Sequence, residues 1–364
     1  MSIWLYIIKR ILIAIPTILM VSIIGFLLMR GSFVLGPWDI PWVDGSTLHL
    51  LDAMQIGNKI DPLAELRNNP QITPEAIAHE AARLGLDKPM WEQYWLWLTN
   101  VLQFHPEALL EGRFLEFFTP DLGKTFNGTD VTHILSARAG NTLLLNIVSL
   151  TLTWLIAVPL GVYASLHWRS LFDRFLTLFS AVGMAFPGFV LALILAIWVV
   201  KTGILPFGGL TSDNFDAMNG FEKAIDILRH LALPVLVLTF GGIAGLQRQM
   251  RGNLLDVLGA EYIRTARAKG LSENVVIYKH AVRTAINPLV TMLGFEFSAI
   301  LGGSILLETV LGYPGIGLLT YKAVLQTDTN LVMASLVLSS VMLVLGNLMA
   351  DILLKLVDPR IELE

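Results

Sequence analysis

The sequence predicts an all-α protein that crosses a membrane several times, and three observations support this fold class. Of 364 residues, 54% are hydrophobic and 15% are charged, whereas a soluble globular domain carries about 25% charged residues. The mean hydropathy is +0.65. Uncharged stretches of the length that a transmembrane helix needs, about 20 residues, recur along the chain. We therefore expect a polytopic helical membrane protein.

Six apolar stretches have the length of transmembrane helices and end at charges or turn residues. They cover residues 11–29, 143–166, 175–200, 231–246, 288–307 and 331–354. The fourth contains Pro234 and the pair Gly241 and Gly242, which packed membrane helices tolerate. The chain then divides into an N-terminus with the first helix (1–30), a hydrophilic segment (31–140), a transmembrane core (141–354) and a tail (355–364).

The distribution of positive charge predicts the orientation. Thirteen Lys and Arg residues lie on the side that holds both termini, and four lie on the short loops of the other side. Cytoplasmic segments carry the excess of Lys and Arg, so both termini are predicted to be cytoplasmic. Segment 31–140, with 14 acidic and 7 basic residues, then lies outside. It contains a predicted helix near 74–84 and an aromatic amphipathic stretch, 91–104, which forms either a small external core or a belt at the lipid headgroups.

Several classes of chemistry are excluded by what the sequence lacks. The absence of cysteine rules out disulfides, thiolate metal sites and thiol catalysis, and the net charge of −4 argues against a nucleic-acid partner. Gly123-Lys124-Thr125 is not a phosphate loop, because position 118 is Phe118 where the motif needs glycine. We expect no catalytic residue, no metal ligand and no bound cofactor in this chain.

Two carboxylates, Glu296 and Asp351, fall inside predicted spans. An ionisable side chain at membrane depth is a functional candidate by default. Two roles remain for Glu296: a residue of a translocation path or a structural hydrogen-bond acceptor. Asp351 lies near a helix end, which favours a structural role. If both relayed protons, the chain would be a proton-coupled secondary transporter. Six spans without inverted repeats fit that alternative poorly.

A polar loop, residues 248–288, separates the fourth and fifth predicted spans. Its pattern predicts a polar helix over 254–269, a break at Gly270 and a second helix that begins near Ser272. Such a helix pair forms a protruding knob. Ala266 and Gly270 are four residues apart, which puts small residues on one face of a helix. A helix that rests on lipid needs large apolar residues instead, so we interpret the knob as a surface for docking another protein.

Residues 262–273 resemble the cytoplasmic EAA-type loop of ABC importer permeases, in the version of the dipeptide, oligopeptide and nickel family of binding-protein-dependent B-type permease subunits. The distance from Gly270 to Pro288 resembles the longer spacing of this subfamily. Other matching motifs are Lys9-Arg10 with Pro16, Leu84 to Pro89, Asp121-Leu122-Gly123, Pro159-Leu160-Gly161, Phe186-Pro187, Gly303-Ser304 with Glu308, Tyr313-Pro314-Gly315-Ile316-Gly317 and Asp358-Pro359-Arg360. The chain departs from the family pattern at 36–39, and residues 102–120 look inserted.

The resemblance implies a type I ABC importer permease fold in the bacterial plasma (inner) membrane, with six transmembrane helices and a large extracytoplasmic insertion between the first two. It implies a transport subunit and not an enzyme, with ATP and Mg used by partner subunits. The implied partners are a second homologous permease, two ATP-binding subunits and an extracytoplasmic solute-binding protein. Peptides are the implied substrates, with nickel chelates, glutathione-like compounds and antibiotic peptides left open.

The resemblance also assigns roles to residues. It implies that the polar loop couples to an ATPase subunit through Glu261, Arg264, Thr265, Ala266, Arg267, Ala268, Lys269, Gly270 and Glu273. Glu296 and Pro187 are the candidates for the translocation path. Close contact is expected at Ala266 and Gly270, with the charged residues as polar anchors.

Overall fold

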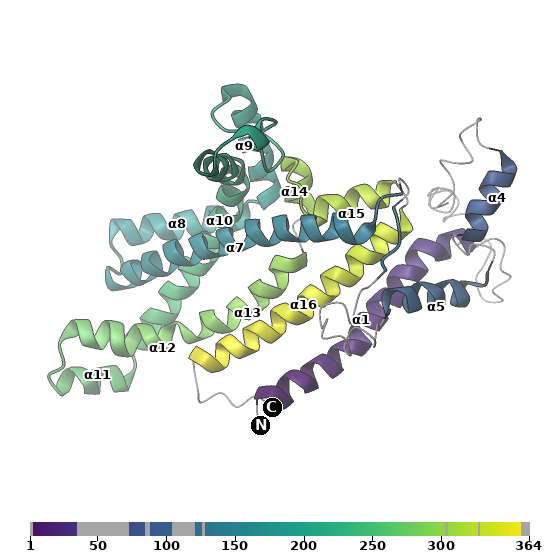
Figure 1. Cartoon of the computed structure of the whole chain (residues 1–364). Coiled ribbons are helices and arrows are strands. Elements are labelled where there is room, and N and C mark those ends of the chain that lie inside the picture. Colours follow the sequence, from purple (N-terminus) through teal and green to yellow (C-terminus); the bar gives the residue numbers. More distant parts are fainter. Residues whose placement is uncertain are drawn as a thin grey trace, which may run out of the picture. The chain divides into compact units, whose positions relative to one another are not determined.

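The computed structural model describes residues 3–34, 73–83, 88–103, 121–125, 128–302, 305–326 and 328–357. These residues are helical apart from loops and one isolated β-bridge between Lys124 and Asp130 (Figure 1). They form two compact units. The first consists of Met1–Ile11, Arg138–Leu318 and Met342–Glu364, and the second of Leu12–Ala137 and Leu319–Val341.

The longest helices are α1 (Ile3–Val34), α7 (Val131–Leu166), α10 (Gly220–Leu258) and α16 (Thr329–Val357). The shorter ones are α4 (Pro74–Arg83), α5 (Met90–Val101), α8 (Leu171–Ala185), α9 (Gly188–Thr202), the 3-10 helix η2 (Phe215–Ala217), α11 (Glu261–Ala268), the π-helix η3 (Val275–Val282), α12 (Arg283–Ala285), α13 (Asn287–Gly302), α14 (Ile305–Leu311) and α15 (Ile316–Leu325).

Within the described residues, the helices α1, α7, α10 and α16 are long and apolar enough to cross a membrane, and α8 with α9 forms a fifth candidate. The predicted span over 288–307 falls on α13 and α14, so the count of six stays a prediction. Parts of several predicted features lie outside the described residues: 36–39, 84–87, 303–304, 358–360 and most of 102–120.

The third predicted span is bent, which corrects the expectation of one helix over 175–200. Helices α8 and α9 meet at 95°. Phe186 has extended backbone angles (φ −87°, ψ 120°), and Pro187 precedes the first residue of α9. Proline has no N–H to donate, and it disfavours helical angles at the preceding residue. The Phe186-Pro187 pair therefore ends α8 and redirects the chain.

Helix α10 is continuous through Pro234 and has 39 residues. At 1.5 Å per residue its length is about 58 Å, against about 30 Å for the hydrocarbon core of a bilayer. It ends at Leu258, and the extended backbone of Ala260 separates it from α11. The predicted single helix over 254–269 is thus wrong. Gly259, a poor helix former, marks the break.

Small residues allow close packing in the first unit, as is typical of membrane helices. Figure 1 shows α8 beside α10. A Cβ atom added to Gly183 of α8 would lie 2.6 Å from the Cβ atom of Ala244 in α10. One turn away, the buried Ser180 hydroxyl donates a hydrogen bond to Gln247 Oε1 over 2.7 Å. The two helices are therefore joined by both steric fit and a polar contact.

In the second unit, the predicted aromatic stretch forms α5, and its side chains divide between two sides. The Tyr94 and Ser22 hydroxyls are hydrogen-bonded over 2.9 Å, and the rings of Tyr94 and Phe26 meet edge to face. Trp91 and Trp95 are instead 70% and 61% exposed. Residues four apart share a helix face, so Trp91 and Trp95 lie together on an exposed side of α5, while Tyr94 packs on α1.

Candidate functional site

The turn at Gly270 closes α11 in a defined geometry. Gly270 has a φ of +76°, and its N–H donates to the Arg267 carbonyl over 2.9 Å while Leu271 N–H donates to the Ala266 carbonyl over 3.4 Å. This pair of bonds around a left-handed residue is a Schellman motif, which satisfies the last carbonyls of a helix. The predicted break at Gly270 is confirmed. Figure 1 shows α11 projecting beyond the end of α10.

The inner side of α11 belongs to an apolar core. Ile263 is fully buried, in a cluster that includes Leu254 of α10 and Val276 of η3. Ala266 is half-buried against the same cluster. Ala266 and Gly270 therefore do not form one free face of a helix, because α11 ends at Ala268 and Gly270 lies in the turn beyond it. The core under the knob is continuous with that of the long helices, since the same cluster includes Ala157 of α7 and Leu289 of α13.

The outer side of α11 carries charges that are exposed and largely paired with one another. Arg264 contacts Glu261 over 2.8 Å, with side chains 66% and 83% exposed. Arg267 donates to both carboxylate oxygens of Glu273, at 2.7 Å for the shortest bond, and so links α11 across the turn. These hydrogen bonds hold the pKa of the Glu273 carboxyl below its usual value. Lys269 makes no ion pair with any described residue.

A buried ion pair joins α8 to α10 in the same unit. Asp173 is 3% exposed, and Arg251 donates to both of its carboxylate oxygens. Asp173 also accepts from the Arg169 N–H over 2.9 Å, and Ser170 caps α8. In the sequence, Arg251 is marked only as one of the positive charges that predict the orientation. The signal available was Ser170 three residues before Asp173, a spacing that marks a helix start.

The two carboxylates of the predicted spans both have partners. Glu296 Oε2 accepts a hydrogen bond from Trp154 Nε1 over 3.1 Å, which joins α13 to α7. Asp351 accepts from the Tyr6 hydroxyl over 2.7 Å and forms an ion pair with Arg10 over 2.9 Å. Asp351 thus ties the end of α16 to the start of α1, in keeping with a structural role. Pro187 lies at the bend between α8 and α9.

A second buried carboxylate, Glu308 of α14, organises the turn from 308 to 318, which we term the Glu308 turn. It is 1% exposed. Its oxygens accept from the Thr142 hydroxyl over 3.2 Å and from the Leu318 N–H over 2.9 Å. Thr142 in turn accepts from the Ile316 N–H over 2.9 Å, and the Tyr313 hydroxyl donates to the Asn141 carbonyl over 2.7 Å. The turn is held to α7 by these bonds.

Two positions of this turn, Gly315 and Gly317, have no room for a side chain. A Cβ atom at Gly315 would lie 2.4 Å from Glu308 Oε1, and one at Gly317 would lie 2.9 Å from the Cα atom of Ile305. Both contacts are shorter than real Cβ atoms make. Tyr313 to Gly317 was noted in the sequence only as a motif. Its interlock with Glu308 and Thr142 depends on residues distant in the chain, and no local pattern marks it.

The long apolar helices and the projecting polar loop define an all-α membrane protein. A family model described as "Binding-protein-dependent transport system inner membrane component" matches residues 157–363. The chain belongs to this family, and it is a multi-pass protein of the inner membrane.

Three similar proteins match most of the chain. The oligopeptide transport system permease protein AppB of Bacillus subtilis is 36% identical, over 98% of this chain and 99% of its own length. The oligopeptide transport system permease protein OppB of Haemophilus influenzae is 33% identical over 98% of both. The dipeptide transport system permease protein DppB of Escherichia coli K12 is 31% identical, over 83% of this chain and 89% of its own length. The predicted family and the transport role, rather than an enzymatic one, are confirmed.

Proposed function

We propose that the chain is the permease subunit of an ATP-driven importer that translocates peptides, which an extracytoplasmic binding protein delivers. The observation that carries this proposal is the similarity to AppB over almost the full length of both proteins. AppB, OppB and DppB are all named for the transport of peptides. The family is defined by dependence on a binding protein. In this proposal the chain binds no cofactor, and partner subunits bind ATP and Mg.

In this proposal the polar loop fits a groove on an ATPase subunit. The exposed residues supply the contact: Glu261, Arg264, Thr265, Arg267 and Ala268 of α11, with Lys269, Gly270 and Glu273 beyond its end. Ala266 holds α11 on its core from the inner side. Because α10 both crosses the membrane and ends at the loop, movement of the ATPases is transmitted to the membrane helices as rigid-body rocking.

The proposed topology has six transmembrane helices, both termini in the cytoplasm and segment 31–140 outside as a large insertion. The excess of Lys and Arg on the side of the termini supports it. Since the chain has no cysteine, single reporter cysteines test it. A membrane-impermeant thiol reagent added outside cells should label Thr129→Cys and spare Ser272→Cys. The opposite pattern would refute the orientation.

Within the membrane core, we assign Glu296 and Pro187 to the translocation path. The Glu296 carboxyl of α13 accepts a hydrogen bond from Trp154 of α7. This bond would break if the two helices moved apart. The bend at Pro187 gives α8 and α9 different directions, which allows them to move separately. Replacing Glu296 with Gln keeps the hydrogen-bond acceptor and should retain ATP-driven uptake, whereas a proton relay would lose it.

The composition of the complex tests the whole proposal. The tagged chain, purified in mild detergent, should arrive with a second homologous permease and two ATP-binding subunits, all identified by mass spectrometry. A chain that purifies alone, with uptake that follows the proton gradient and ignores ATP, would instead support a proton-coupled secondary transporter.

A further inference from the structure

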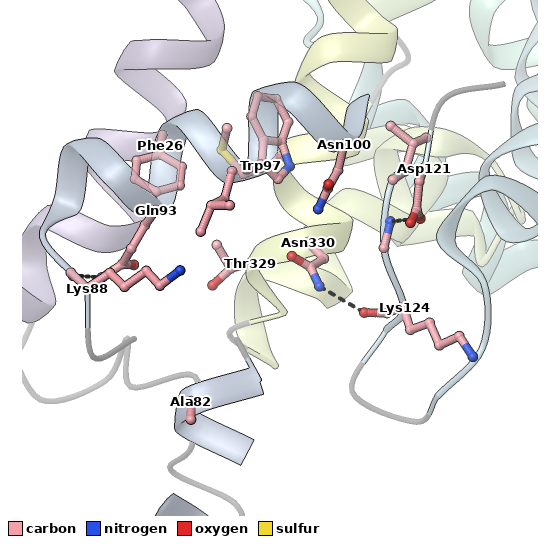
Figure 2. A pocket seen from close by; sticks show the side chains of 14 residues that line it. Phe26, Ala82, Lys88, Gln93, Trp97, Asn100, Asp121, Lys124, Thr329 and Asn330 are labelled. Carbon is pink, nitrogen blue, oxygen red and sulfur yellow. Dashed lines mark hydrogen bonds between the residues drawn. The ribbon is translucent and has the colours of Figure 1, made fainter. Parts of the chain in front are cut away.

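The second unit contains a polar pocket with a volume of about 430 Å³ (Figure 2). It is lined by α1, α5, the start of α16 and the loop at 121–124, with Phe26, Leu96 and Met333 among its apolar walls. Its volume falls within the range of small-molecule sites, about 300–1,000 Å³. None of the residues assigned above to coupling or translocation lines it.

Three buried polar atoms of this pocket's lining have no hydrogen-bond partner among the described residues. They are Gln93 Oε1, Trp97 Nε1 and Thr329 Oγ1. Thr329 is 7% exposed. An unsatisfied buried polar atom is destabilising and uncommon in folded proteins. One is an acceptor, one is a donor, and the Thr329 hydroxyl can act as either, so a ligand with both amide N–H and carbonyl groups would satisfy all three.

Opposite charges line the same pocket. Figure 2 shows the Lys88 side chain directed into it and the Lys124 side chain directed away. Asp121 is also among the lining residues, and one of its carboxylate oxygens accepts from the Gly123 N–H over 2.9 Å. A phosphate-rich ligand would meet a carboxylate here, and a lipid chain would leave the polar atoms unsatisfied. A zwitterion fits both charges.

The walls of the pocket are held in place by hydrogen bonds among the lining residues and between α5 and α1. Gln93 Nε2 donates to the Lys88 carbonyl over 2.7 Å, which fixes the start of α5. Asn330 Nδ2 donates to the Lys124 carbonyl over 3.0 Å, which ties the loop to α16. The bond between Tyr94 and Ser22 holds α5 on α1. The polar groups are therefore positioned before any ligand arrives, which lowers the entropic cost of binding.

We propose that this pocket binds a short free peptide, with its carboxylate at Lys88 and Thr329 and its amino group toward Asp121. Gln93 and Trp97 then receive the amide N–H and carbonyl groups between them. A free peptide carries both terminal charges within a few residues, which a loop of a folded protein does not. This inference rests on the proposed function and topology, and it places a peptide site on the extracytoplasmic side, apart from the translocation path.

The test uses the complete complex in lipid nanodiscs, without ATP and without binding protein, and equilibrium dialysis with labelled trialanine. Lys88→Met should weaken the binding of trialanine at least tenfold and leave that of trialanine amide, which lacks the carboxylate, nearly unchanged. Thr329→Val and Trp97→Phe should weaken trialanine binding several-fold. The matched controls are Thr99→Val and Trp95→Phe, which change exposed side chains of α5 outside the pocket and should bind as the wild type does.

The melting temperature separates a loss of binding from a loss of folding stability. Thr329→Val removes a buried hydroxyl without a partner, so its melting temperature should equal or exceed that of the wild type even while peptide binding falls. Wild-type complex that does not bind trialanine, or pocket variants that bind it normally, would overturn the inference. So would variants that lose only the association with the binding protein. Wild-type uptake driven by ATP is measured separately, and its absence would refute the proposed function instead.

Discussion

Two glycine-containing turns of the first unit use glycine for opposite reasons. At Gly270 a Cβ atom would meet nothing within 4 Å, but the backbone has a φ of +76°. At Gly315 the backbone is not in the left-handed region, but a Cβ atom would lie 2.4 Å from Glu308. Glycine is needed at position 270 because the backbone is left-handed there, and at position 315 because a side chain would collide with Glu308.

The charged residues around the two turns differ in their exposure to solvent. Arg267 and Glu273 are 43% and 55% exposed, so water screens their interaction and either is free to exchange its partner. Glu308 is buried, and its carboxylate accepts from the Thr142 hydroxyl and the Leu318 N–H. The turn at Gly270 has the features of a surface that meets another protein, whereas the Glu308 turn has those of a fixed internal joint. Substitutions in the Glu308 turn are therefore expected to cost more folding stability than substitutions at the turn of Gly270.

Gly315→Ala should cost about 3 kcal/mol of folding stability, because the added methyl group has to displace the buried Glu308 carboxylate from its donors. Thermal unfolding in detergent, followed by tryptophan fluorescence, measures the loss. Gly140→Ala is the matched control: Gly140 lies in α7 with nothing within 4 Å of the added Cβ atom, so the melting temperature should hold or rise slightly. Equal losses in the two variants would remove the steric argument.

Asp173→Asn should cost about 2 kcal/mol, since it leaves the partly buried Arg251 guanidinium without its counter-charge. Like the Glu308 turn, this ion pair is internal to the chain. The exposed Asp256 of α10 provides the control, because Asp256→Asn changes the same chemical group where water already solvates it. If urea unfolding gives the two variants the same stability, the pair between α8 and α10 contributes nothing.

Gly270→Val should abolish transport while the chain remains inserted in the membrane. A left-handed conformation costs an L-residue about 1–2 kcal/mol, enough to distort the turn but not to unfold a membrane core. Gly270→Asn should retain part of the activity, because asparagine tolerates this conformation better. Uptake assays on membranes with equal amounts of each variant make the comparison. Normal uptake by the valine variant would show that the turn has no role in coupling.

The smallest effect concerns pH. The hydrogen bonds from Arg267 lower the pKa of Glu273, so the pair stabilises the turn above the unfolded pKa of the carboxyl. That contribution is lost as the pH falls through the lower, folded pKa. Hydrogen exchange across the turn should therefore be faster in Glu273→Gln than in the wild type at pH 7, after correction for intrinsic rates. The two should converge in acid, and a difference independent of pH would exclude this ion pair as its cause.

Features encoded locally were predictable from the sequence. The long apolar stretches became α1, α7, α10 and α16, and Gly270 became a helix end, because hydropathy and glycine act within a few residues. The Phe186-Pro187 pair was noticed, yet the 95° bend was missed. Proline in a membrane helix allows either a kink or a full change of direction, and packing decides which.

Long-range contacts explain the remaining differences. The interlock of Glu308 with Thr142 joins residues 166 positions apart, and the pair of Asp173 with Arg251 spans 78. The inward position of Ala266 follows from where α11 ends, which is set by the turn at Gly270 and the core at Ile263. A spacing of four residues predicts a shared face only inside a continuous helix.

The most direct test of the account is peptide uptake into proteoliposomes that contain this chain with its proposed permease and ATPase partners. A saturating peptide-loaded binding protein is supplied at the extracytoplasmic face, ATP is supplied at the ATPase face, and the proton gradient is dissipated. The account predicts labelled peptide crossing from the binding-protein side only with hydrolysable ATP, and no crossing with Gly270→Val. Uptake that persists without ATP, or that stops when the proton gradient is dissipated, would contradict it.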